Sequence, residues 1–372
     1  MTGAFLYLSA SFGLPHWVML CAFIPAIYLN RNEIAVKIQS ILAGRIEFTN
    51  GLWILLGIST FVGINAIFHF NFEALVYPAL LFSSGLMALG LSRNDFRWIA
   101  SFAAIEAIVC MIEYSLQLPS ILPWIETKGM LTDSGLLYQN RVYGISDESS
   151  NAAQKMLLGL LALPVFVNDK DQKLKIALSI LIGAGLVLSF NRTVLLVTAV
   201  YLFASFVVEF GKRPLSKTKV RKLSIFLLAG LGFIFALLIV GGDKILAQFT
   251  RGTGALEMAG RSDVWIYCKD FILSNPLWGN AAEKWYFGSY HAHNSYLQIA
   301  ASYGIPALFG YLLLIVTGIN QGNAIRISCL LVYSFFQYGF GWAFSLFDLF
   351  LLSLILHPNS LTGHSPCLYK NT

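Results

Sequence analysis

Charged side chains are scarce in this sequence: Asp, Glu, Lys and Arg make up 12% of its 372 residues, whereas 57% are hydrophobic. The mean hydropathy is +0.68. Soluble domains carry about 25% charged residues, so the composition excludes a water-soluble globule. The apolar runs are long enough to cross a hydrocarbon layer of about 30 Å. They are apolar on every face, which favours helices over an outer-membrane barrel.

Patterns for disulfides, metals and cofactors are also lacking. Of the five cysteines, Cys21, Cys110 and Cys329 lie in apolar runs, so no disulfide framework is indicated. His291 and His293 form an H-x-H pair, but no set of carboxylates or cysteines completes a metal site around it. No glycine-rich phosphate loop is present. We therefore expect neither a metal nor a cofactor. The N-terminus also lacks the features of a removable signal peptide.

The apolar runs predict an all-α, polytopic membrane protein with eleven or twelve transmembrane helices in a single membrane domain, 1–372. Residues 4–14 form either a further short span or the outer half of the first one. The other expected spans are 17–29, 51–68, 75–91, 99–116, 151–167, 176–190, 193–208, 223–240, 294–317, 327–340 and 342–356.

The basic residues predict the orientation of the chain. Its net charge of +6 comes from Lys and Arg in short connections, which is typical of membrane topology and argues against a nucleic-acid partner. If the connection between the first two long spans is cytoplasmic, simple alternation also places most of the 25 basic residues inside. The outer side then receives Arg141, Arg192, Arg261, His291 and His293. Cations placed against the topological bias indicate a bound anion, although outer connections ordinarily carry some basic residues.

Arg192 lies in a short turn between two apolar runs, Ser189-Phe190-Asn191-Arg192-Thr193, so its guanidinium is expected at the membrane boundary. Two interpretations remain open. The side chain either reaches toward lipid phosphates, or it clamps a diphosphate, because a planar guanidinium binds two oxygens and keeps its charge.

The large outer connection, 241–293, is predicted to be folded. Residues 263–273, DVWIYCKDFIL, have the apolar spacing of an amphipathic helix on the membrane surface, and Asn275-Pro276 ends it. Arg261 would lie at the start of this helix, where it either faces an anion or pairs with an acidic neighbour.

Three further residues are candidates for acid–base or binding roles. A neutral His293 beside arginines could accept a proton from a sugar hydroxyl; alternatively it only forms hydrogen bonds at a helix start where Asn294 is the N-cap. Glu106 and Glu113 are seven residues apart and share one face of the span 99–116. Because buried carboxylates are costly in a membrane, we expect them to pair with an arginine or bind acceptor hydroxyls, unless they merely lie near the helix end.

Several short motifs follow one another over about 141–311. They are Arg-x-x-Gly followed by Asn (Arg141, Gly144, Asn151), Ser-x-x-Arg-Thr (Ser189, Arg192, Thr193), Arg-x-x-x-Trp (Arg261, Trp265), Pro-x-x-Gly (Pro276, Gly279), His-Asn-x-x-Leu (His293, Asn294, Leu297) and Tyr-Gly-Ile-Pro. Each motif is weak alone, but their order, their spacing and their expected position on one side of the membrane are specific. In this order they resemble the O-antigen ligase and polymerase superfamily of bacterial envelopes.

The resemblance implies a GT-C-like, multi-helix glycosyltransferase of the bacterial inner membrane with a periplasmic active face. Such an enzyme moves a glycan from undecaprenyl diphosphate to an acceptor hydroxyl, with inversion and without a metal. The acceptor is the lipid A core sugar in ligases, another lipid-linked repeat in polymerases, and a protein Ser or Thr in a third branch. The sequence slightly favours a ligase.

Transferred residue by residue, the resemblance assigns the diphosphate to Arg192 and Arg261 and acceptor activation to His293. Arg141 is a weaker match, because the following GISDESSN segment is longer and more acidic than the family pattern. With Arg141, the expected substrate-binding residues are His291, Asn294, Glu106 and Glu113. The expected partners are the lipid-linked donor, the glycan acceptor and membrane lipids.

Two functions of other classes remain open. A transporter or flippase for an anionic lipid would use the same arginines, with Glu106 and Glu113 coupling ion movement. A non-catalytic scaffold of an envelope assembly complex would tolerate the loss of His293.

Overall fold

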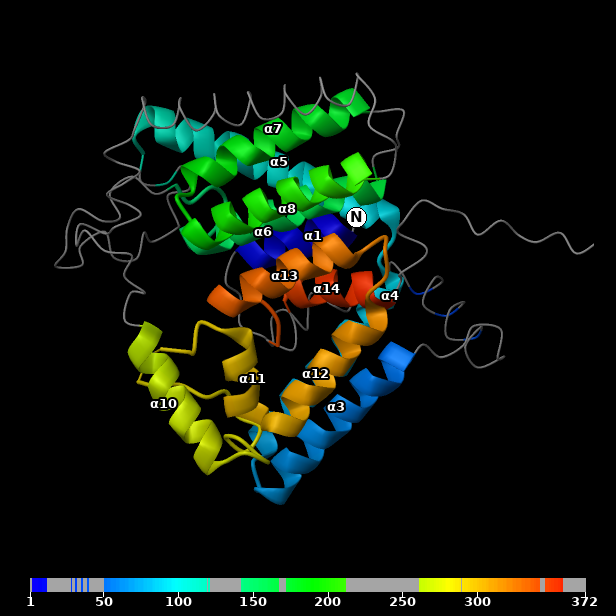
Figure 1. Ribbon diagram of the computed structural model, residues 1–372, viewed down its shortest axis with the longest axis vertical. Coiled ribbons are helices and arrows are strands. Elements are labelled where there is room, and N and C mark those ends of the chain that lie inside the picture. Colours follow the sequence, from blue (N-terminus) through cyan, green and yellow to red (C-terminus); the bar gives the residue numbers. More distant parts are fainter. Residues whose placement is uncertain are drawn as a thin grey trace, which may run out of the picture.

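The computed structural model describes residues 2–11, 28, 31, 35, 39, 50–118, 120, 142–166, 172–211, 261–288, 290–341 and 345–356. Within these ranges the chain is helical, and its only strand-like pairing is an isolated bridge between Phe287 and Tyr290 (Figure 1). The all-α expectation is confirmed. The helices are α1 (Thr2–Ser11), α3 (Asn50–Phe68), η1 (Phe72–Leu75), α4 (Val76–Gly90), α5 (Arg93–Leu116), α6 (Ser149–Phe166), α7 (Gln172–Leu188), α8 (Arg192–Gly211), α10 (Arg261–Ser274), α11 (Ser295–Tyr303), α12 (Ile305–Gly318), α13 (Ala324–Phe336) and α14 (Leu346–Leu356).

Several helices have the length and composition of membrane spans. Three segments are long and apolar enough to cross a bilayer: Asn50–Phe68, Phe72–Gly90 and Arg93–Leu116. Four shorter apolar helices begin at Arg192, Ile305, Ala324 and Leu346. These helices agree with a membrane protein. The expected spans 17–29 and 223–240 lie outside the described residues, so the total of eleven or twelve stays a prediction.

The expected single span 294–317 is wrong, because the chain breaks at Gly304 into α11 and α12. Gly304 has φ +91°, and a Cβ there would lie 2.0 Å from the carbonyl oxygen of Leu277. Only glycine fits such a close approach without strain. The amide of Ile305 donates to the carbonyl of Pro276 at 2.8 Å, and a proline follows in the first turn of α12. The break therefore ties the bundle to the connection that precedes α11.

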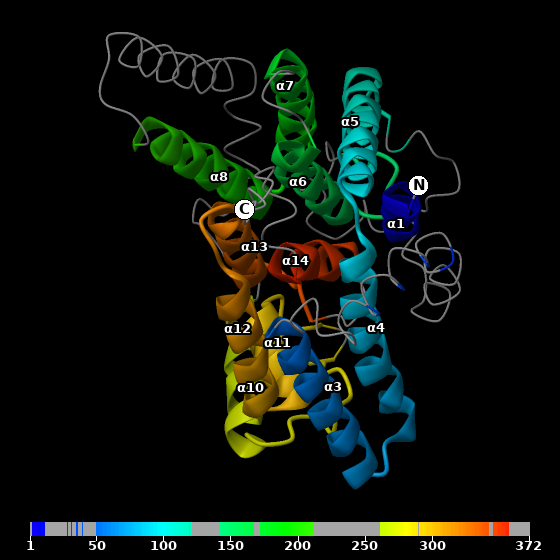
Figure 2. The ribbon, with the colours of Figure 1, turned by 90° about the vertical axis from the view of Figure 1, so that its right-hand side faces the viewer.

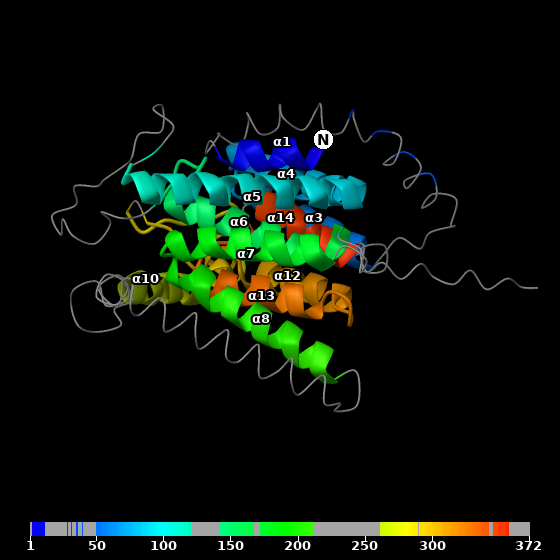
Figure 3. The same cartoon turned by 90° about the horizontal axis from the view of Figure 1, so that it is seen from above.

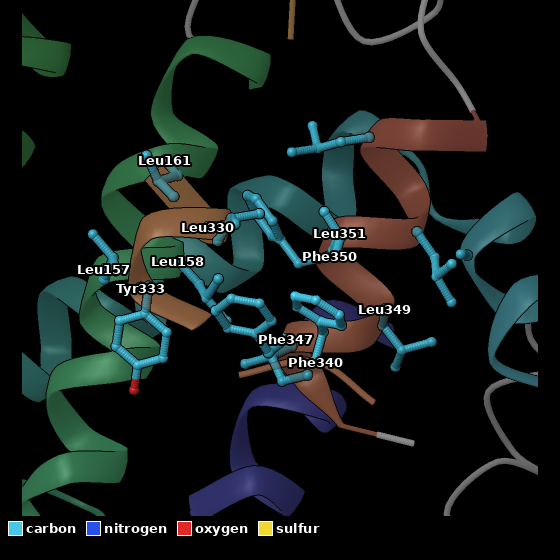
Figure 4. Close-up of a cluster of buried hydrophobic side chains, with 14 of the residues drawn as sticks. Leu157, Leu158, Leu161, Leu330, Tyr333, Phe340, Phe347, Leu349, Phe350 and Leu351 are labelled. Atoms are coloured by element: carbon cyan, nitrogen blue, oxygen red, sulfur yellow. The ribbon is translucent and has the colours of Figure 1, made fainter. Parts of the chain in front are cut away.

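Two groups of helices make up the described bundle (Figures 1 and 2). Helices α5, α6, α7 and α8 form one half, with α5 packed on α6 and α7. Helices α3, α10, α11 and α12 form the other half, where α12 packs on α3. Helix α14 lies between the halves and is buried along its whole length. Figure 4 shows where they meet, with leucines of α6 facing Leu330 and Tyr333 of α13 and Phe347 and Phe350 of α14.

The bundle brings several helix ends to one side. Helices α5 and α6 are antiparallel, since Arg93 Nε near the start of α5 donates to the carbonyl of Val165 near the end of α6 at 2.9 Å. In Figure 3 the end of α5, the start of α8 and helix α10 all lie on the left. The residues expected outside by charge alternation, where described, belong to this end of the bundle.

Candidate functional site

His291 and His293 form a contacting pair in the connection before α11. Their ring centroids are 4.0 Å apart, and the His293 amide donates to His291 Nδ1 at 3.1 Å. His293 has φ +48°, in the left-handed region that residues with a Cβ seldom adopt. This conformation places the two imidazoles side by side.

The polar face of α11 holds this connection in place. The Asn294 Oδ1 accepts from the amides of Tyr296 and Leu297 at 2.9 and 3.0 Å, which confirms the expected N-cap. Its Nδ2 donates to the carbonyl of Phe335 at 2.9 Å. Asn294 is almost fully buried and makes structural contacts, so the geometry favours a positioning role over the expected contact with substrate.

Gln298, one turn after Asn294, was missed by the sequence analysis. Its Oε1 accepts the amide of Ala292 at 2.8 Å, and its Nε2 donates to the carbonyl of Trp285 at 2.7 Å. Ser302, a further turn on, accepts the Trp285 amide at 3.0 Å. The four-residue spacing of these polar residues in an apolar segment was the available signal. Together they fix the backbone before the histidine pair, at Trp285, and between its two members, at Ala292.

Arg261 reaches the same place from α10. Its Nη1 donates to the carbonyl of Phe336 at 2.7 Å, next to the carbonyl that receives Asn294. The indole of Trp265 donates to the carbonyl of Ala292 at 2.6 Å. A helix, α10, does form over the expected range 263–273, and Val264, Cys268 and Ile272 pack it on α11.

Both histidines are neutral at pH 7. Burial lowers the pKa of His293 to about 4, and the positive charge of Arg261 lowers it further in the same direction. Burial also lowers the pKa of His291 to about 3, helped by His293, Arg261 and Lys284. The Nδ1 of His293 is buried and has no hydrogen-bond partner in the described structure. An unprotonated imidazole with a free nitrogen can accept a proton.

Lys284 is a second residue that the sequence analysis missed. Its side chain is 5% exposed and lies over the ring of Tyr77 at 5.4 Å. Burial lowers the pKa of Lys284 to about 7, and the opposing charge of Asp348 acts in the other direction. Asp348, in α14, accepts the amide of Gly341 at 2.8 Å and the hydroxyl of Ser345 at 2.9 Å. Lys284 also lowers the pKa of His291 by its charge. A lysine whose own pKa is near neutrality therefore lies close to the histidine pair.

Arg192 begins α8 after a strained turn. Phe190 has φ +49°, and the Asn191 side chain caps the helix by accepting the amide of Val194 at 3.2 Å. The expected span end at Phe190 is therefore too late, since α7 ends at Leu188. Asn191 is the residue that allows a new helix to start so soon after the turn.

Helix α8 carries Arg192 toward the end of the bundle that holds Arg261. Helices α8 and α13 pack together and run in opposite directions (Figures 1 and 3). Tyr201 of α8 interacts with Arg326 near the start of α13. Because the two helices are antiparallel, the start of α8 at Arg192 lies toward the end of α13 at Phe336. The carbonyl of Phe336 is the one that accepts from Arg261. Arg192 and Arg261 come from separate helices to the same side of the molecule.

Glu106 and Glu113 are fully buried, and protein groups occupy their carboxylates. Glu113 Oε2 accepts the amides of Tyr143 and Gly144, and Glu106 Oε1 lies 3.2 Å from Lys155 Nζ. Of the alternatives raised from the sequence, pairing with a cation is the one that Glu106 adopts, with lysine in place of arginine. Arg141 lies outside the described residues. Among the described residues, no group of three or more His, Cys, Asp or Glu side chains is arranged to hold a metal.

These features define a multi-helix membrane protein with basic and imidazole side chains gathered at one end of its bundle. The model of the O-antigen ligase family matches residues 177–312, a segment that includes Arg192, Arg261 and His293. This match confirms the resemblance to the O-antigen ligase and polymerase superfamily. No curated protein and no solved structure matched the chain. The family and the apolar helices point to a bacterial membrane protein with a function of the O-antigen ligase or polymerase type.

Proposed function

We propose that this protein transfers a glycan from an undecaprenyl-diphosphate-linked donor to a sugar hydroxyl at the periplasmic face of the bacterial inner membrane. The observation that carries the proposal is the convergence of Arg261 and the His291–His293 pair beside Phe335 and Phe336, within the segment matched by the O-antigen ligase family. The connection 241–293 would then be a periplasmic loop, and the chain a single membrane domain.

The chemistry requires charge neutralisation and the removal of one proton. The acceptor oxygen attacks the anomeric carbon and forms the new glycosidic bond, while the bond to the diphosphate breaks and its electron pair leaves with the phosphate oxygen. Arg192 and Arg261 would neutralise this leaving group, and His293 would take the acceptor proton. Direct attack inverts the anomeric configuration. The lipid diphosphate is already a good leaving group, so positioning supplies much of the rate enhancement.

The neutral state of His293 supports its role as the base. Its pKa is lowered by burial and by Arg261, so the imidazole is unprotonated before the substrates bind. The left-handed backbone at His293 is a further sign of function, because such strain persists where surrounding contacts enforce it. His291 contacts His293 and would position it. Arg141 would contribute another cation, as the family resemblance implies.

The same chemistry serves a repeat-unit polymerase, which differs only in its acceptor. A transporter is less well supported, because the carboxylates expected to couple ion movement are occupied. Glu106 contacts Lys155, and Glu113 accepts two backbone amides. Both carboxylates thus bond to groups of the protein itself.

A deletion strain of the source bacterium tests the proposal. We expect His293→Ala and Arg261→Ala to insert at wild-type levels but to fail to restore glycan transfer. His69→Ala and Arg97→Ala are matched controls outside the site, and we expect both to restore it. Restoration by the Arg261 and His293 variants would contradict the proposal. Loss of all glycan-capped lipopolysaccharide with accumulation of lipid-linked polymer would identify a ligase; capping by single repeats would identify a polymerase.

A further inference from the structure

Helix α5 presents two buried carboxylates to the segment that precedes α6. Glu113 Oε2 accepts the backbone amides of Tyr143 and Gly144, each at 2.8 Å. Two amide donors on one carboxylate oxygen fix the path of a backbone closely, and hydrogen bonds to a charged acceptor are stronger than neutral ones. Glu113 therefore holds the first part of this segment, which we call the 142–146 segment.

Glu106 holds the other part of the 142–146 segment and joins it to two helices. Its Oε1 accepts the hydroxyl of Ser146 at 2.5 Å and lies 3.2 Å from Lys155 Nζ of α6. Its Oε2 accepts the hydroxyl of Tyr7 from α1. Lys155 is 2% exposed and Glu106 is fully buried, and the Lys155 ammonium also lies over the Tyr7 ring at 4.6 Å.

This ion pair needs an explanation other than stability. Removing two charges from water costs about as much as their attraction returns, so a buried pair is weak evidence of net stabilisation. Such pairs instead suit a role in specifying one arrangement of the surrounding chain. Here that arrangement is the packing of the 142–146 segment against α5 and α6.

Gly144 shows how closely the segment approaches α5. Its φ is +61°, and a Cβ at this position would lie 2.8 Å from Glu106 Cγ and 3.1 Å from Cys110 Sγ. A larger residue would lift the segment off the helix. The segment thus has one position, set by α5.

Two contacts connect α5 and α6 to the turn before Arg192. Ser149, at the start of α6, donates its hydroxyl to the carbonyl of Ser189 at 3.3 Å. Tyr114, next to Glu113 on α5, contacts the ring of Phe190 with centroids 6.3 Å apart. Phe190 is the residue with φ +49°, so the strained turn is braced from both α5 and α6.

We propose that Glu106 and Glu113 are positioning residues, which act through the 142–146 segment and Ser149 to hold the turn that presents Arg192. The inference rests on the proposed donor site, because it assumes that Arg192 binds the diphosphate. It reassigns the two carboxylates from substrate binding to orienting an arginine. Lys155 supplies the charge that allows Glu106 to stay buried.

A double-mutant cycle on donor binding tests the inference. The probe is undecaprenyl diphosphate, with its Kd measured on the full chain in nanodiscs for wild type, Glu113→Ala, Arg192→Ala and the double variant. We expect Glu113→Ala to weaken binding about tenfold. The double variant should bind no more weakly than Arg192→Ala, because Glu113 acts through that arginine. Glu113→Gln keeps an acceptor oxygen for the two amides, so it should restore most of the affinity.

The outcomes separate the inference from the proposed function. Wild-type binding by Arg192→Ala would refute the proposed donor site and the inference with it. Weak binding by Arg192→Ala with wild-type binding by Glu113→Ala would overturn only the positioning role. Losses that multiply in the double variant would also overturn it, since they would mean that Glu113 acts independently of Arg192.

A milder variant keeps the test decisive if Glu113→Ala does not fold. Ser149→Ala removes a single hydroxyl that donates to Ser189, and we expect it to weaken binding about threefold without adding to the effect of Arg192→Ala. Ser150→Ala is the matched control, because that hydroxyl donates to Glu148 and does not reach the turn. Equal affinities for the Ser149 and Ser150 variants would overturn the inference.

Discussion

The histidine connection and the Arg192 turn are held at the same end of the bundle by different chemistry. Neutral side chains of α11, above all Asn294 and Gln298, hold the histidine connection. Buried charges on α5 and α6, chiefly Glu106 and Lys155, hold the segment that braces the Arg192 turn. Loss of a neutral hydrogen bond lowers the free energy of unfolding modestly. Loss of one partner of a buried ion pair lowers it more, because the other charge stays buried without a partner. The two regions should therefore respond differently to substitution.

The largest expected effect is on the histidine side and concerns the reaction itself. His293→Ala removes the proposed base and should lower kcat/KM by about 10²- to 10⁴-fold. The rate of glycan transfer by purified protein measures this, with His69→Ala as the control. A His293→Ala variant that transfers glycan at the wild-type rate would show that His293 is not the base.

Breaking the charged region should cost the most stability. Glu106→Gln leaves Lys155 buried without its partner, which should lower the free energy of unfolding by about 3–5 kcal/mol. Glu106→Gln combined with Lys155→Met removes both charges and should recover most of that loss. Thermal unfolding in nanodiscs compares the two. If the double variant unfolds at a temperature no higher than that of Glu106→Gln, the unpaired charge of Lys155 is not the source of the lost stability.

Breaking the neutral region should cost less stability. Gln298→Ala leaves the buried amide of Ala292 without its acceptor, and we expect a loss of about 1–3 kcal/mol. The same variant should lower kcat/KM, because the histidine pair loses its anchor. Gln154→Ala, on α6, provides a glutamine control away from this connection. If Gln298→Ala loses as much stability as Glu106→Gln, the neutral and the charged regions do not differ in the way proposed.

The smallest expected effect is in the pH profile. The folded pKa of His293 is about 4, below its ordinary value of 6.5, so the free enzyme keeps a neutral base as the pH falls through 6.5. We expect kcat/KM to stay flat from pH 8 to about pH 5.5 and to fall only as the pH approaches 4. Lys284 titrates near 7, so the profile should be recorded for Lys284→Met as well. A loss of activity centred at pH 6.5 in both proteins would contradict the lowered pKa.

The sequence predicts the parts of this structure that depend on local pattern. Hydropathy located α3 through α8, the spacing of apolar residues located α10, and the residue type at Asn294 predicted its cap. The break at Gly304 was missed because it depends on the Leu277 carbonyl, which is distant along the chain. Lys284 and Lys155 were missed for a similar reason, since tertiary neighbours bury them.

The two carboxylates of α5 show the same limit. Their spacing placed them on one face, and their cost in a membrane marked them as important. Their partners come from α1, α6 and the 142–146 segment, and no pattern in the sequence links these to α5. Composition and periodicity identified the residues, while the packing of distant segments defines their contacts.

The position of the bound donor tests the central claim most directly. A cryo-electron microscopy map of the protein in nanodiscs with undecaprenyl diphosphate would reveal it. We predict that the diphosphate lies between the guanidinium groups of Arg192 and Arg261, with His293 facing the space beside it. A diphosphate bound at the opposite end of the bundle, near Arg97, would contradict the account.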